Sequence, residues 1–124
     1  MNNFQLTKNF NLQEFACKDG SSLVKIDEKL VNKLQTLRNL VAKPVEILSG
    51  YRTPEYNKLV GGVDGSYHLD GQAADIRVEC MSVSELAKVA EQIGFDGIGT
   101  YLPNTTRIGF VHVDVRGYKS RWEG

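Results

Sequence analysis

The two histidines of this chain lie in polar motifs that could bind a metal ion. His68 is followed seven residues later by Asp75, and His112 comes much further along the chain. Two imidazoles and one carboxylate are a ligand set that zinc takes readily. Three protein ligands leave a fourth coordination position for water, as in catalytic zinc sites, whereas structural sites normally use four ligands, mostly cysteines. These residues therefore predict one zinc ion, held by His68, Asp75 and His112.

The sequence between His68 and Asp75 indicates how the chain could return to the same point. Gly71 permits a sharp turn, because glycine accepts a positive φ without steric cost. Residues 73–78 have the character of a strand, and the two alanines at its start would let the backbone pack closely beside the site. A surface turn followed by an ordinary strand is the alternative for this motif taken alone. The second histidine motif favours the metal site.

Residues 108–115 are predicted to form the last strand, which carries His112. Residues two apart in a strand point to the same face, so His112, Asp114 and Arg116 are expected on one face. The valines between them would face the core, which is the alternation of a half-buried strand. The polar face is then either an active cleft or plain solvent-exposed surface.

The pattern S-x-H-x-x-G-x-A-x-D at residues 66–75, followed by H-x-D at 112–114, resembles the zinc D-alanyl-D-alanine peptidases. These enzymes share the hedgehog/DD-peptidase fold, and the chain resembles their small branch of compact peptidoglycan peptidases from bacteria and phages. The stretch S-G-Y-R-T-P-E-Y-N at residues 49–57 is also similar to that branch. The likeness runs from about Phe10 to Trp122, which is nearly the whole chain.

This resemblance implies zinc-dependent hydrolysis of peptide bonds in peptidoglycan stem peptides or cross-links, by a carboxypeptidase or an endopeptidase. It also implies that Arg52 lies in the cleft, where it contacts substrate or stabilises the reaction intermediate. A surface ion pair between Arg52 and a carboxylate such as Glu55 is the alternative. Ser66 is expected to hydrogen-bond the substrate backbone or a zinc ligand. Tyr51 and Tyr67 are expected to line the cleft, with Tyr51 in contact with the substrate, and simple packing is the alternative for either ring.

The general base is where this sequence departs from the family. Several relatives carry an acidic residue three positions before the last histidine ligand, and Gly109 occupies that position here. We therefore assign the catalytic base to Asp114, with the alternative that Asp114 orients a zinc-bound histidine. Asp70 and Asp96 are weaker candidates.

Two other functions compete with a peptidase. A zinc-containing binding module of the same fold, without catalysis, is favoured by Gly109. A protein–protein adaptor without a metal would leave both histidine motifs unexplained. The intact motifs around His68, His112 and Arg52 favour the enzyme.

Composition is that of an ordinary soluble domain: 124 residues, 41% hydrophobic and 24% charged. We expect one domain over residues 1–124 that is a monomer, with residues 1–8 as a loose arm. Fifteen basic and fifteen acidic residues exclude a general basic field for nucleic acid, and no apolar run is long enough to insert into a membrane. Cys17 and Cys80 are expected to be reduced and partly buried, although sequence leaves a bridge between them open.

The expected place of action is the bacterial cell wall, yet residues 1–8 do not resemble a signal peptide. A phage lysin, a domain cut from a longer exported protein, or a chain lacking its leader would reconcile the two. The fold class that we predict is α+β, with helices packed on a mainly antiparallel four-stranded sheet, like the hedgehog/DD-peptidase fold. Its helices and strands are predicted from periodicity and caps: a helical turn at 11–15, helices at 27–43, 53–59 and 82–93, and strands at 45–51, 73–78, 97–102 and 108–115.

Overall fold

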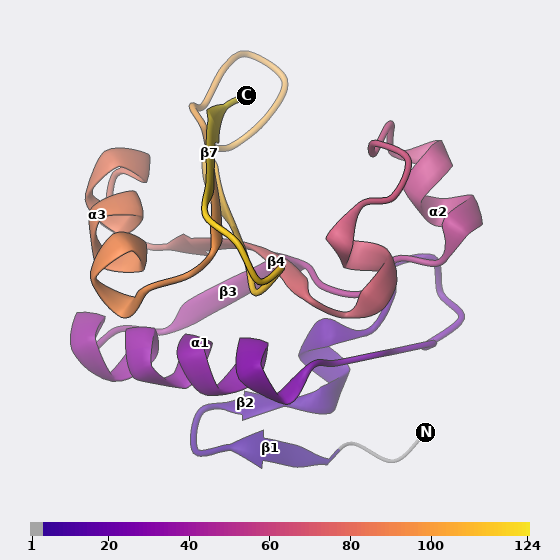
Figure 1. The fold of residues 1–124 in the computed structure, drawn as a ribbon, viewed down its shortest axis with the longest axis horizontal. Helices are drawn as coiled ribbons and strands as arrows, with labels where there is room; N and C mark the ends of the chain where they lie inside the picture. Colours follow the sequence, from indigo (N-terminus) through magenta and orange to yellow (C-terminus); the bar gives the residue numbers. More distant parts are fainter. Residues whose placement is uncertain (1–3) are drawn as a thin grey trace.

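The computed structural model describes residues 4–124 and shows an α+β fold built on a five-stranded sheet (Figure 1). Its strand order is β3-β4-β6-β5-β7, with every neighbouring pair antiparallel except β5 and β7. The strands are β3 (Val45–Ser49), β4 (Ala73–Val78), β5 (Gly97–Tyr101), β6 (Phe110–Asp114) and β7 (Ser120–Glu123). The prediction of a mainly antiparallel four-stranded sheet is therefore corrected to a mixed sheet of five, in which β7 is the added strand. The short run that forms β7 has no alternating apolar pattern and is a strand because it pairs in parallel with β5.

The three α-helices match the predicted ones closely, because their caps are explicit in the sequence. They are α1 (Glu28–Val41), α2 (Pro54–Leu59) and α3 (Val83–Ile93). The side chains of Asp27 and Thr53 accept hydrogen bonds from the first turns of α1 and α2, and Ser82 forms a capping box with Glu85 at α3. Two short 3₁₀ helices, η1 (Leu12–Phe15) and η2 (Tyr67–Asp70), complete the helical elements of the described residues.

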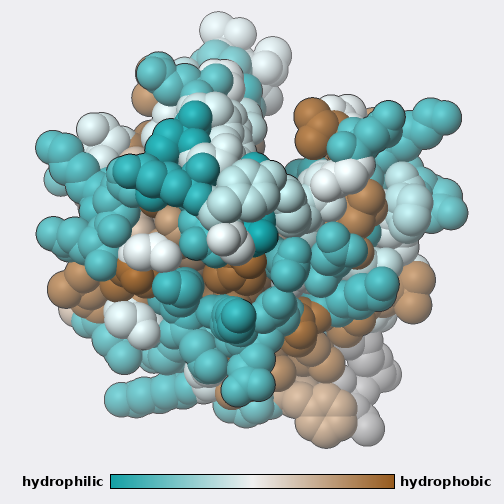
Figure 2. Space-filling model, viewed as in Figure 1, coloured by the Kyte–Doolittle hydropathy of each residue, from teal (hydrophilic) through white to brown (hydrophobic). Residues whose placement is uncertain are grey.

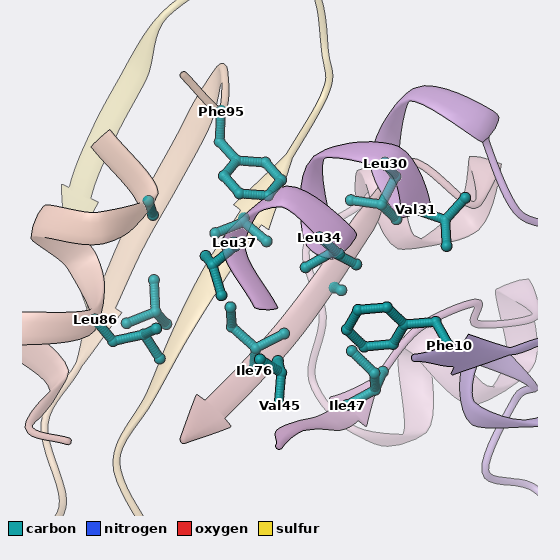
Figure 3. Packing of buried hydrophobic residues seen from close by; sticks show 14 of the residues in the cluster. Phe10, Leu30, Val31, Leu34, Leu37, Val45, Ile47, Ile76, Leu86 and Phe95 are labelled. Atoms are coloured by element: carbon teal, nitrogen blue, oxygen red, sulfur yellow. The ribbon is translucent and has the colours of Figure 1, made fainter. Parts of the chain in front are cut away.

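The hydrophobic core lies between one face of the sheet and the helices α1 and α3. Leu34 and Leu37 of α1 reach toward Ile76 of β4, and Leu86 of α3 closes the other end of the cluster (Figure 3). Each of these four side chains is buried. Burial of one leucine or isoleucine side chain contributes about 1.5–3 kcal/mol to the free energy of folding. This cluster therefore stabilises the packing of α1 and α3 on the sheet.

Strand alternation places a different set of residues on the opposite face of the sheet. In β4, Ala74 and Ile76 belong to the core, and Asp75 between them points to the other face. In β6, Val111 and Val113 belong to the core and flank His112. Asp75 and His112 are direct partners in the antiparallel register of β4 and β6. Pairing of these two strands therefore brings a carboxylate and an imidazole side by side, away from α1 and α3.

The segment near the N-terminus is more ordered than the predicted loose arm. Residues 5–7 form β1 (Gln5–Thr7), which pairs with β2 (Phe10–Asn11), and the Thr7 hydroxyl donates a 2.7 Å hydrogen bond to Gln35 of α1. Residues 1–3, also part of that predicted arm, lie outside the described residues. The buried ring of Phe10 anchors this hairpin to the core.

Two smaller expectations concern the cysteines and the membrane. Both cysteines are free, as expected, but Cys80 is exposed whereas Cys17 is buried. Within residues 4–124, none of the helices has the length and apolar character that crossing a bilayer requires.

Candidate metal centre and active-site cleft

His68, Asp75 and His112 converge from three different elements: η2, β4 and β6. One ligand atom from each residue lies within 4.8 Å of the others. The Oδ1 atom of Asp75 is 3.2 Å from His68 Nε2 and 3.1 Å from His112 Nδ1. Two ligand atoms on a tetrahedral zinc ion with bonds of about 2.0–2.1 Å are separated by about 3.3 Å. The donor set and the two distances to Asp75 therefore fit a zinc ion.

Each histidine ring is oriented by a hydrogen bond on the nitrogen that faces away from this point. His68 Nδ1 donates to the backbone carbonyl of Gly50 over 2.7 Å, which leaves Nε2 facing Asp75. His112 Nε2 donates to Asp114 over 2.8 Å, which leaves Nδ1 facing Asp75. Metal-binding histidines usually have such a partner on the second nitrogen. Both rings are thus presented as ligands, one through Nε2 and the other through Nδ1.

The local turn predicted at Gly71 positions His68 relative to Asp75. Gly71 has a φ of 70° and ends η2, and a Cβ there would lie 2.5 Å from the carbonyl oxygen of Lys25. A residue with a side chain is therefore excluded by both conformation and space. At the other end of η2, the Ser66 hydroxyl accepts a 3.3 Å hydrogen bond from the His68 backbone amide. Ser66 thus caps the short helix that carries His68.

The electrostatics of the site favour ionised carboxylates. Burial opposes ionisation of Asp75, but hydrogen bonds from His112 and His68 outweigh it and hold the pKa of Asp75 well below its usual range. Burial also opposes ionisation of Asp114, and hydrogen bonds from His112 and Arg116 hold its pKa low. For His112, burial lowers the pKa, but hydrogen bonds to Asp114 and Asp75 outweigh this effect and raise it. A proton and a metal ion therefore compete for the His112 ring.

Arg52 lies at the metal centre rather than in a surface pair with Glu55. Its guanidinium donates to Asp75 Oδ2 over 3.2 Å, to the Ser49 hydroxyl over 3.1 Å and to the Asn57 side chain over 3.2 Å. These three contacts fix the guanidinium at the edge of the cleft. The cation also stabilises the charge on Asp75.

A cavity of about 500 Å³ opens on the side of the sheet that carries His68, Asp75 and His112, between the loop after α2 and the strands β5–β7. The space-filling view shows a notch in the molecular outline between these two regions, with mostly hydrophilic and intermediate residues around it (Figure 2). Its walls include the three converging residues and Arg52, together with Tyr67 and Arg116. They also include residues that the sequence did not single out as site residues: Asp64, Tyr101, Phe110 and Trp122. The cavity gives a substrate access to His68, Asp75 and His112.

A model of the family described as peptidase M15 matches residues 7–114. The peptidoglycan L,D-endopeptidase MepK of Escherichia coli K12 is 34% identical over 102 residues, covering 77% of this chain. The probable peptidoglycan L,D-endopeptidase MepK of Haemophilus influenzae is 31% identical over 115 residues, covering 86% of the chain. The chain belongs to the peptidase M15 family. A zinc D-Ala-D-Ala carboxypeptidase of Streptomyces albus G is 36% identical over 67 residues, which cover 53% of this chain and 26% of that protein.

The chain spans about half the length of the curated M15 relatives that it matches. The aligned part is 54% of the E. coli protein and 59% of the H. influenzae protein. The match to the M15 family model ends at Asp114. Arg116 and Trp122, which line the cavity, therefore lie beyond the matched residues.

The geometry at Asp114 does not favour the catalytic base that we expected there. Its side chain is fully buried, and its oxygens accept hydrogen bonds from His112 and Arg116. Asp114 does not line the cavity, in contrast to Asp75 and His112. A base must reach the water whose proton it accepts, so the arrangement fits the alternative that Asp114 orients His112.

Two further expectations from the M15 resemblance need revision. A Cβ on Gly109 would lie 2.8 Å from side-chain atoms of Pro103 and Val83, which are not part of the cavity wall. An acidic residue there would point away from His112, so Gly109 does not argue against catalysis in this structure. Tyr51 was expected to contact substrate, but its ring faces Lys25 and does not line the cavity, whereas Tyr67 does.

Asp70 and Asp96, the two weaker candidates for the base, also lie outside the cavity wall. Asp96 accepts a 2.9 Å hydrogen bond from the Gly117 amide, and Asp70 is an exposed residue of η2. Neither lines the cavity. Among the carboxylates of residues 4–124, the cavity wall contains Asp64 and Asp75. Sequence could not separate these candidates, because the choice depends on which side of a loop or strand faces the cleft.

Proposed function

We propose that this protein hydrolyses peptide bonds in the peptide part of peptidoglycan, as a zinc metallopeptidase acting at the bacterial cell wall. The observation that carries the proposal is the convergence of His68, Asp75 and His112 beside an open cleft. One ligand atom of each residue lies within 4.8 Å of the ligand atoms of the other two. Membership of the M15 family and the activities named for its relatives support the same reaction.

His68, Asp75 and His112 would hold the single zinc ion. When bound, zinc supplies Lewis acidity and lowers the pKa of a coordinated water toward neutrality. The three protein ligands leave a coordination position for that water. Their three rigid supports are the Gly50 carbonyl, Arg52 and Asp114, which hold each ligand side chain in place.

Arg52 is our candidate for stabilising negative charge on the substrate. Its guanidinium is fixed by Ser49, Asn57 and Asp75, so it needs no reorganisation when charge develops on a scissile carbonyl. The same guanidinium could bind a substrate carbonyl or carboxylate in the ground state. Ser66 lines the cavity beside it and is the second candidate for contact with the peptide backbone.

The proton acceptor of the reaction has to line the cleft. Asp75 is proposed as a zinc ligand, which leaves Asp64 as the other carboxylate of the cavity wall. Asp64 is exposed and lies in a loop that contains Gly61, Gly62 and Gly65. We therefore move the general base from Asp114 to Asp64, and Asp114 takes the role of orienting His112.

Digestion of purified peptidoglycan tests the proposal. We expect the zinc-loaded protein to release peptide fragments that mass spectrometry identifies, and the His112→Ala variant to release none. The masses also tell a D-Ala-D-Ala carboxypeptidase, which removes a terminal residue, from an L,D-endopeptidase, which divides a cross-link. A fully zinc-loaded protein that leaves a panel of stem peptides and cross-linked fragments intact would contradict a peptidase and favour the non-catalytic binding module.

A further inference from the structure

The residues that follow β6 form a clamp around the carboxylate of Asp114. Arg116 donates from Nε to Asp114 Oδ1 over 3.0 Å and from Nη2 to Oδ2 over 2.6 Å. Its backbone amide adds a 3.2 Å hydrogen bond to Oδ1. Since the carboxylate is fully buried, the guanidinium neutralises a charge that water cannot reach. Asp114 is thus held from one side by Arg116 and from the other by His112.

Aromatic rings in turn hold the Arg116 guanidinium. Its central carbon lies 4.4 Å from the ring centre of Tyr67, 5.0 Å from that of Trp122 and 5.6 Å from that of Tyr118. Arginine stacks favourably on aromatic rings at such distances. The hydroxyls of Tyr67 and Tyr118 are 3.0 Å apart, which joins η2 to the segment after β6. The guanidinium therefore has little freedom to leave Asp114.

Two glycines of β5 make room for this arrangement. Gly97 is the strand partner of Asp114, and a Cβ there would collide with the Asp114 carboxyl group. Gly99 is the strand partner of His112, and a Cβ there would collide with the ring of Trp122. The Trp122 ring lies 5.0 Å from the ring of His112. The space beside His112 is therefore shaped by residues that no expectation from the sequence placed in the site.

We propose that Arg116 is a positioning residue for the metal centre: it fixes Asp114 so that His112 keeps its Nδ1 atom directed at the ion. This inference rests on the zinc site of the proposed function. Without the guanidinium fork, the buried Asp114 carboxylate would keep only His112 and the backbone amide of residue 116 as partners, and its orientation would be less well fixed. His112 would lose the fixed acceptor that sets its ring orientation and tautomer. Loss of such outer partners typically weakens metal affinity about 10- to 100-fold.

Zinc affinity, measured by competition with a chromophoric chelator, tests the inference without any assay of catalysis. The variants are Arg116→Ala, Asp114→Ala and the double variant. Arg121→Ala is the matched control, because Arg121 lies on the same segment and pairs with the exposed Glu91 on the far side of the sheet edge. We expect a loss of about 10- to 100-fold for Arg116→Ala and an unchanged affinity for Arg121→Ala.

The double variant distinguishes positioning from a general loss of structure. If Arg116 acts through Asp114, removing Arg116 in the Asp114→Ala background has no further effect on zinc affinity. A loss below threefold for Arg116→Ala, or an equal loss in both backgrounds, would overturn the inference. If Arg116→Ala does not fold, Arg116→Lys replaces it, and a loss of zinc affinity below threefold would again overturn the inference. Lysine keeps the positive charge but cannot donate the two parallel hydrogen bonds of the guanidinium.

A spectroscopic signature completes the test. In the zinc-loaded protein, nitrogen-15 NMR of the two histidines should show His112 protonated on Nε2, with slow exchange of that proton. We expect the signal to persist in Arg121→Ala and to be lost to exchange in Arg116→Ala. Its persistence in Arg116→Ala would overturn the inference. Failure of the wild-type protein to bind zinc would instead contradict the proposed function, so the two failures are distinguishable.

Discussion

Each of the three proposed zinc ligands has a hydrogen-bond partner of its own in the protein. His68 is held by the Gly50 carbonyl, Asp75 by Arg52, and His112 by Asp114. These partners remove the freedom of the rings and the carboxylate to turn away before a metal binds. Loss of a ligand should therefore weaken zinc binding more than loss of the residue that holds that ligand in place.

Replacement of either histidine should remove tight zinc binding. For His68→Ala and His112→Ala we expect zinc affinity to fall by more than about 100-fold. Loss of a residue that only hydrogen-bonds a ligand typically costs about 10- to 100-fold. Metal analysis after dialysis measures this directly. Asp70→Asn is the control, since Asp70 is exposed on the same short helix as His68. An unchanged zinc content in either histidine variant would remove that histidine from the ligand set.

Asp64 provides a test of the reassigned general base. Asp64→Asn should retain zinc, because Asp64 is outside the converging group of ligands, and should lower kcat by about 100-fold or more. Steady-state kinetics on a stem peptide, together with zinc analysis, gives both quantities. Wild-type turnover in this variant would exclude Asp64. Asp114→Asn offers the contrast: it should weaken zinc binding, whereas a base at Asp114 would leave zinc binding intact.

At the scale of elements, β5 and β7 form one wall of the cleft. Trp122 of β7 donates a 2.8 Å hydrogen bond to the Tyr101 hydroxyl and packs over Gly99, and the two strands pair in parallel. The position of the ring is therefore set by two residues of β5: Tyr101, which accepts its hydrogen bond, and Gly99, which leaves the space it occupies. A change in that gap should move the ring.

Gly99→Ala should displace Trp122 at a cost of about 1–3 kcal/mol, since its methyl group would overlap the indole. Trp122 is the single tryptophan of the chain, so its fluorescence reports this movement without interference. We expect emission at longer wavelength and a lower melting temperature. Thr100→Ala on the same strand is the control. An unchanged spectrum in Gly99→Ala would mean that the ring is not held against Gly99.

Helix α1 supports the sheet through a narrow apolar face. Leu34 is fully buried against the sheet, whereas Leu40 of the same helix is 55% exposed. Leu34→Ala should lower the free energy of unfolding by about 2–5 kcal/mol because it leaves a cavity. Leu40→Ala should change it by about 0.5 kcal/mol or less. Denaturant unfolding measures both, and similar values for the two variants would contradict the packing described for α1.

For the molecule as a whole, the metal centre joins elements that are far apart in the sequence. A zinc ion bound by His68, Asp75 and His112 would link η2 to the central strands β4 and β6. Binding to the folded state alone adds stability in proportion to the logarithm of metal concentration. The fold itself rests on the core behind the sheet, so it should survive without the metal.

Removal of zinc should therefore lower stability without unfolding the protein. At a free zinc concentration of 100 times the dissociation constant, we expect about 2.7 kcal/mol of added stability. Differential scanning calorimetry with and without a chelator measures the change in melting temperature. The His112→Ala variant should show no response to zinc. A metal-dependent fold, seen as loss of the cooperative transition in chelator, would contradict a core that is independent of the site.

The sequence by itself determined the choice of His68, Asp75 and His112 as proposed zinc ligands, and it located the strands that carry two of them. Periodicities of two and of 3.6 residues are local properties, so they placed His112 opposite the core valines of its strand and defined the buried face of α1. Gly71 and the helix caps were readable for the same reason, since turn and cap chemistry acts over a few residues.

Only the tertiary structure decided which other side chains surround the site. Whether Asp114, Asp64 or Tyr51 faces the cleft depends on the pairing of strands and the path of loops, and local patterns do not encode either. The parallel addition of β7 brings Trp122 beside His112 and Arg116, and these contacts arise from strand pairing and ring packing across the sheet. Long-range pairing of this kind is a cooperative property of the packed chain, so it could not be derived from the residues one segment at a time.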